Sequence, residues 1–69
     1  MKSERETLEA LVRTICLSLE EIYEAGGTKR DFLTGQIYAY VECLEVLQGC
    51  AEIRRELLNY EIEEKFPLP

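Results

Sequence analysis

The fold is decided by residues 34–66, which read TGQIYAYVECLEVLQGCAEIRRELLNYEIEEKF. Two rows of apolar side chains run through this stretch at helical spacing, and glutamates fill much of the remaining side. The first row consists of Leu33, Ile37, Tyr40, Leu44, Leu47, Ala51, Leu58, Ile62 and Phe66. The second row, which we call the seam, consists of Ala39, Cys43, Val46, Cys50, Ile53, Leu57 and Tyr60. The seam alternates between steps of four and three residues, a spacing that is typical of a coiled coil.

The polar side keeps its phase across Gly49, and this continuity predicts one helix over residues 34–66. A glycine inside a helix costs about 1 kcal/mol, which a helix with such regular periodicity tolerates. The alternative is a break near Gly49 that gives a three-helix bundle. Such a break would place Cys50 or Ala51 at the N-cap of the next helix, where neither residue is favourable.

Another helix is predicted before this stretch, at about residues 4–25. Ser3 and Glu6 form a capping box at its start, and a Gly-Gly pair follows its end. Its apolar residues fall within one arc of the helix: Leu8, Leu11, Val12, Ile15, Cys16, Leu19, Ile22 and Tyr23. We therefore expect a single helical domain over residues 1–69, with two helices and an extended tail at residues 67–69.

The lengths of the two helices differ. At 1.5 Å per residue, the first would be about 33 Å long and the second about 50 Å. In a hairpin, the first helix covers part of the first apolar row and leaves the seam in water. An apolar patch of that size is unusual on a soluble monomer. We therefore predict an all-α helical hairpin with a long second helix, pairing along the seam with a second copy as a four-helix-bundle homodimer.

Composition argues against several function classes. Fourteen Asp and Glu residues against eight Lys and Arg give a net charge of −6, which opposes direct binding to nucleic acid. No apolar run approaches the ~20 residues that span a bilayer, and the polar faces are too acidic for a membrane anchor. The chain has no histidine, and its three cysteines lack the spacing of a zinc site, so we expect no metal and no cofactor.

The cysteines also bear on the compartment. Cys16, Cys43 and Cys50 are an odd number, and the chain starts with the charged stretch MKSERE. A secreted disulfide scaffold normally shows an even count of cysteines behind an apolar leader. We therefore expect reduced thiols and a cytoplasmic protein.

Candidate partner-binding residues lie on the polar sides of the two helices. Tyr38 falls beside glutamates, and tyrosine is enriched at interface hot spots. Leu17 interrupts the polar side of the first helix. The predicted partner-binding set is Leu17, Tyr38, Glu42, Glu45 and Glu52, and its carboxylates suit a basic protein surface. The competing interpretation is a solvated surface, because lone exposed apolar residues are common.

Paired glutamates can perform acid–base catalysis when they are positioned in a cleft. Glutamates on the polar face of a helix are normally hydrated and have no catalytic role. A 69-residue bundle also offers little cavity for a substrate. We therefore predict no catalytic residue, no small-molecule substrate and no enzymatic activity.

Residues 32–45, FLTGQIYAYVECLE, resemble small uncharacterised helical proteins encoded by phages and mobile elements of Gram-positive bacteria. The resemblance assigns no functional residue and implies only a setting. Small acidic proteins of that setting include anti-CRISPR inhibitors, which occupy positively charged nucleic-acid channels. The expected function is a non-enzymatic acidic protein–protein interaction module that inhibits a nucleic-acid-binding complex. The alternatives are a structural homodimerisation module with no dedicated target and a redox regulator that uses its seam thiols.

Overall fold

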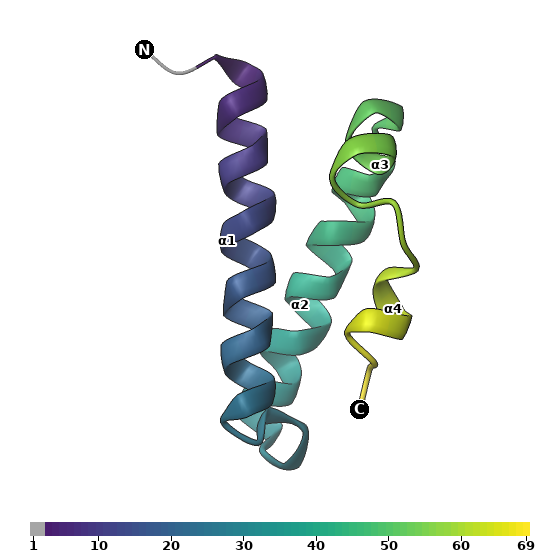
Figure 1. Ribbon diagram of the computed structural model, residues 1–69. Helices are drawn as coiled ribbons and strands as arrows, with labels where there is room; N and C mark the ends of the chain where they lie inside the picture. Colours follow the sequence, from purple (N-terminus) through teal and green to yellow (C-terminus); the bar gives the residue numbers. More distant parts are fainter. Residues whose placement is uncertain (1–2) are drawn as a thin grey trace.

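The computed structural model describes residues 3–69, and every regular element within them is helical. The prediction of an all-α fold is therefore confirmed. The elements are α1 (Glu4–Glu24), the short 3-10 helix η1 (Gly27–Lys29), α2 (Asp31–Gln48), α3 (Ala51–Glu56) and α4 (Ile62–Lys65). Helices α1 and α2 form a hairpin, and α3 and α4 turn back along α2 (Figure 1). No helix within residues 3–69 is long and apolar enough to cross a lipid bilayer.

Local contacts determine both ends of α1. The Ser3 side chain accepts a hydrogen bond from the backbone N–H of Glu6 at 3.2 Å, which caps the first turn. At the other end, Gly26 has a φ of 75°, a left-handed conformation that suits glycine. A Cβ at Gly27 would lie 2.4 Å from Cγ2 of Ile22, so a side chain there would clash. The two glycines therefore let α2 start close beside the end of α1.

The predicted single helix over residues 34–66 is wrong. Helix α2 ends at Gln48, and Cys50 is extended, with φ −80° and ψ 120°. The break lies at Gly49, where the alternative prediction places it, and Cys50 forms no side-chain cap for α3. A further interruption leaves residues 57–61 outside any helix. The second half of the chain is thus three helices of decreasing length.

The two breaks are favourable because they bury apolar side chains that a straight helix would leave in water. Leu58, Ile62 and Phe66 reach the core because the chain folds back on the hairpin. Burying a large apolar side chain contributes about 1.5–3 kcal/mol, and three such residues outweigh the loss of a helical turn. The Gln48 side chain also donates hydrogen bonds of 2.8 Å to the carbonyl oxygens of Leu58 and Tyr60. The turn is therefore hydrogen-bonded as well as buried.

The C-terminal segment forms a further layer on one side of the α1–α2 hairpin (Figure 1). The ring of Phe66 stacks on that of Tyr23, with centroids 6.3 Å apart. The Tyr23 hydroxyl donates to the carbonyl of Pro67, and the Tyr38 hydroxyl donates to the carbonyl of Pro69 at 2.9 Å. The core between these layers consists of Val12, Ile15, Leu19, Ile22, Ile37, Val41, Leu44, Ile53, Leu58, Ile62 and Phe66.

Candidate functional site

The structure divides the predicted seam between the surface and the core. Its first four residues stay exposed: Ala39, Cys43, Val46 and Cys50. Its last three are buried in the core or packed against it: Ile53, Leu57 and Tyr60. The seam is therefore not the continuous face that the sequence predicts, because the break at Gly49 turns its two halves in different directions.

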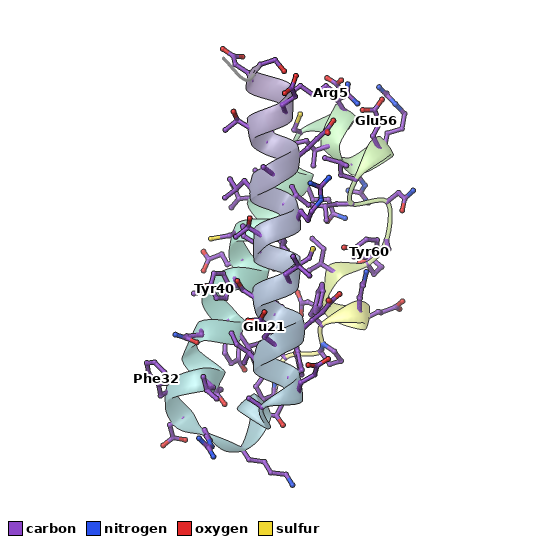
Figure 2. The ribbon with its side chains drawn as sticks, turned by 60° about the vertical axis from the view of Figure 1, so that its left-hand side comes forward. Arg5, Glu21, Phe32, Tyr40, Glu56 and Tyr60 are labelled. Atoms are coloured by element: carbon purple, nitrogen blue, oxygen red, sulfur yellow. The ribbon has the colours of Figure 1, made fainter. Side chains whose placement is uncertain are left out.

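An apolar groove runs between α1 and α2. It is lined by Leu11, Ile15, Ala39, Cys43, Val46 and Leu47, with Glu42 among them. Three of the four exposed seam residues, Ala39, Cys43 and Val46, lie in the wall that α2 forms, and α1 supplies the other wall. Val46 is 73% exposed and Leu11 is 45% exposed, so the groove is open to solvent. We call this surface the α1–α2 groove. In the view of Figure 2, α2 is visible on one side of α1, and α3 and α4 are visible on the other side.

A second surface gathers carboxylates from two separate parts of the chain. Helix α2 contributes Glu42 and Glu45, and the chain around the start of α4 contributes Glu61 and Glu63. The hydrogen bond between the Glu45 and Glu63 side chains raises the pKa of Glu45 above its usual value, as do desolvation and the negative charges of all three neighbours. We call these four glutamates the acidic surface.

The predicted partner-binding residues do not form one site. Glu42 and Glu45 lie together on α2, with Tyr38 one turn before them. Tyr38 is partly engaged by the chain itself, because its hydroxyl donates to the tail. Glu52 lies on α3 and pairs with an arginine of α1. Leu17 is 52% exposed on α1 and belongs to neither the groove nor the acidic surface.

Sequence reasoning missed Glu61 and Glu63 as neighbours of Glu45. On one continuous helix, Glu45 and Glu63 would lie about 27 Å apart. The fold-back that brings them together depends on core contacts between distant residues, which helical periodicity does not encode. The local signal for it is Gly49, which disfavours an uninterrupted helix.

At the open end of the hairpin, Arg5 connects α1 to α3. Its Nε donates to Glu9 at 2.9 Å, and its other two nitrogens pair with Glu52 and Glu56. Figure 2 shows Arg5 on α1 facing Glu56 on α3. A cavity of about 190 Å³ beside this network is lined by the apolar side chains of Leu8, Cys50, Ile53 and Leu57. Three carboxylates already contact the guanidinium, so we interpret the network as a structural link between α1 and α3.

The three cysteines are free thiols with different surroundings. The Sγ of Cys16 lies 3.8 Å from the hydroxyl of Tyr60, whereas Cys43 and Cys50 are exposed. Burial, and then the contact with Cys16, raises the pKa of Tyr60 to about 12. Within residues 3–69, no group of three or more histidine, cysteine or acidic side chains is placed to hold a metal ion. Cys43 is the thiol that lies in the α1–α2 groove.

Comparisons of the chain with protein-family models, with curated proteins and with solved structures found no match. The function is therefore inferred from the α1–α2 groove and the acidic surface. These two surfaces differ in chemistry, because one is mainly apolar and the other is negatively charged.

Proposed function

We propose that the protein is a non-enzymatic interaction module whose acidic surface binds a basic surface on another protein. The proposal rests on the crowding of Glu42, Glu45, Glu61 and Glu63, which is close enough to raise the pKa of Glu45. Like charges held this close repel one another, and a cationic partner would replace the repulsion by attraction. Within residues 3–69, none of the ion pairs involves these four carboxylates.

A nucleic-acid-binding complex is the partner class that this surface suits. A channel that holds nucleic acid presents lysine and arginine to the phosphates, and closely spaced carboxylates compete for the same cations. The net charge of −6 attracts such a channel before contact. The resemblance of residues 32–45 to phage and mobile-element proteins favours the same setting, in which the protein would act as an inhibitor in the host cytoplasm.

The first experiment measures DNA binding by a panel of purified nucleic-acid-binding complexes, including guide-loaded Cas9-type complexes, with and without this protein. We expect at least one complex to lose DNA binding when the protein is added. The inhibition should weaken between about 0.05 and 0.5 M salt, because salt screens charge attraction. A panel in which no complex is inhibited would rule out the proposed inhibitor function.

Two matched double variants test where the charge must lie. Glu42→Gln with Glu45→Gln neutralises part of the acidic surface. Glu21→Gln with Glu24→Gln removes the same charge from exposed positions of α1; Glu21 is labelled in Figure 2. We expect the first pair to slow association with the inhibited complex about tenfold and the second pair to have little effect. Equal effects would show that net charge, rather than this surface, drives binding.

A further inference from the structure

We propose that a second copy of this chain docks on the α1–α2 groove, so that two hairpins pair as a homodimer with their α2 helices antiparallel. The groove is on a side of the hairpin that the C-terminal layer leaves open. It lies next to the acidic surface, and Glu42 is the residue that the two share. Because Glu42 belongs to both surfaces, self-association is tested at Val46, which lines the groove and is not part of the acidic surface.

The groove belongs to a longer exposed apolar face. Phe32 is 74% exposed and lies two heptads before Val46, on the same face of α2. Figure 2 shows Phe32 projecting outward near the loop end of the hairpin. Leu11 adds apolar surface from α1. Exposed apolar side chains gathered on one face of a small protein mark an interaction site.

The shape of α2 favours a second copy as the occupant. Gly35, Ala39 and Cys43 recur at every fourth position, so no side chain in this row is larger than a thiol. The bulkier Val46 lies on the other side of Cys43. When two copies pair about a two-fold axis near Cys43, Val46 of each copy meets Ala39 of the other, a large side chain against a small one. This face is therefore complementary to an antiparallel copy of itself.

The size and charge of the face agree with a dimer. The Cα trace of the described residues measures 38 × 25 × 15 Å, so the molecule is a thin slab with broad sides. A stable interface typically buries ~800 Å² per partner, so the contact must extend from the groove along α2 to the exposed Phe32. Glu42 is the one charged residue that lines the groove within residues 3–69, so the groove suits an apolar occupant. A fold of this length has a marginal core, which association stabilises.

Sedimentation equilibrium of the full chain between about 1 and 100 µM tests the dimer. We expect the mass to rise from 8.0 kDa to twice that value. The rise should come at lower concentration in high salt, because salt screens the repulsion between two acidic copies. Val46→Glu should stay monomeric with an unchanged circular dichroism spectrum, because Val46 is exposed in the isolated copy. Leu17→Glu, which alters an exposed apolar residue outside the groove, should still dimerise.

Thiol cross-linking with a short bismaleimide tests the antiparallel arrangement. Cys43 alone, with Cys16→Ser and Cys50→Ser, should link two copies efficiently. Cys50 alone, with Cys16→Ser and Cys43→Ser, should not, because Cys50 lies beyond Gln48, the last residue of α2. The two Gln48 residues would already lie about 15 Å apart along the helix axes.

Several outcomes would overturn this proposal. A mass of 8.0 kDa throughout the concentration range would do so, as would a dimer that survives Val46→Glu or links more readily through Cys50. Protection of Cys43 only after another protein is added would assign the groove to a different occupant. A monomeric Val46→Glu variant that still inhibits its target complex would leave the function of the acidic surface intact.

Discussion

The side-chain amide of Gln48 donates a hydrogen bond of 2.8 Å to the backbone carbonyl of Leu58, ten residues later in the chain. The same nitrogen donates to the carbonyl of Tyr60 at 2.8 Å. One side chain at the last position of α2 thus connects the first break in the chain to the second. This contact stabilises the fold-back that buries Leu58.

Gln48→Ala should lower the free energy of unfolding by about 1–3 kcal/mol, because two partly buried carbonyls lose their donor. Urea unfolding followed by circular dichroism measures the change. Gln36→Ala is the matched control, since Gln36 lies in the same helix and its side chain forms no hydrogen bond within residues 3–69. A similar loss of stability in both variants would contradict the role given to Gln48.

The sequence predicts α1 to within one residue at each end. The cap at Ser3 and the turn at Gly26 depend on residues that are neighbours in sequence, so they can be recognised without the rest of the fold. The buried side of α1 follows in the same way from the spacing of its apolar residues. In the second half of the chain Gly49 is the only such signal that we identify, and Cys50 gives α3 no side-chain cap.

The spacing of apolar residues does not show whether a helix continues or breaks. Leu58, Ile62 and Phe66 follow one another at steps of four residues, yet they belong to two short segments that fold back on the hairpin. Their burial against distant residues decides that the chain breaks, and tertiary contacts of this kind override local helix preference.

Only the part of the acidic surface that lies on α2 can be predicted from the sequence. Glu42 and Glu45 are three residues apart on α2, so their proximity follows from helical geometry alone. Glu61 and Glu63 join them only through the fold-back, and no pattern in the sequence places them there.

Phe66→Ala should lower the free energy of unfolding by about 3–5 kcal/mol, since it leaves a cavity in the core. Phe66 is 3% exposed and stacks on Tyr23. A small domain is stable by roughly 5 kcal/mol, so the variant should be close to unfolding at room temperature. Thermal melting by circular dichroism tests this. Leu17→Ala, which truncates an exposed side chain, should change stability by no more than about 0.5 kcal/mol, and comparable effects of the two would count against a packed C-terminal layer.

Arg5→Gln should loosen α3 while the rest of the fold persists. The substitution removes the charge that holds Glu52 and Glu56, both on α3, against α1. Hydrogen exchange of the α3 amides should therefore become faster, and high salt should reduce the difference between the variant and the wild type. Arg13→Gln is the control, because Arg13 is exposed on α1 outside this network. Unchanged exchange in Arg5→Gln would show that the ion pairs do not hold α3.

The contact between Glu45 and Glu63 makes stability depend on pH. The pKa of Glu45 is raised in the folded protein, first by the hydrogen bond with Glu63. A group whose pKa is higher in the folded state binds its proton more readily there, so protonation favours folding. This contribution is fully present below the unfolded-state pKa of Glu45 and is lost as the pH rises through its folded-state pKa. The pair should therefore stabilise the protein in mild acid and destabilise it near neutral pH.

Glu63→Gln should raise the free energy of unfolding at neutral pH, because it removes the charge that opposes ionised Glu45. It should also reduce the gain in stability between roughly pH 7 and pH 5, since Glu45 then titrates closer to its usual range. Urea unfolding at the two pH values measures both effects. Glu21→Gln removes one exposed carboxylate of α1 and should keep the pH dependence of the wild type. If Glu63→Gln gains as much stability on acidification as the wild type does, the pH dependence must come from other carboxylates.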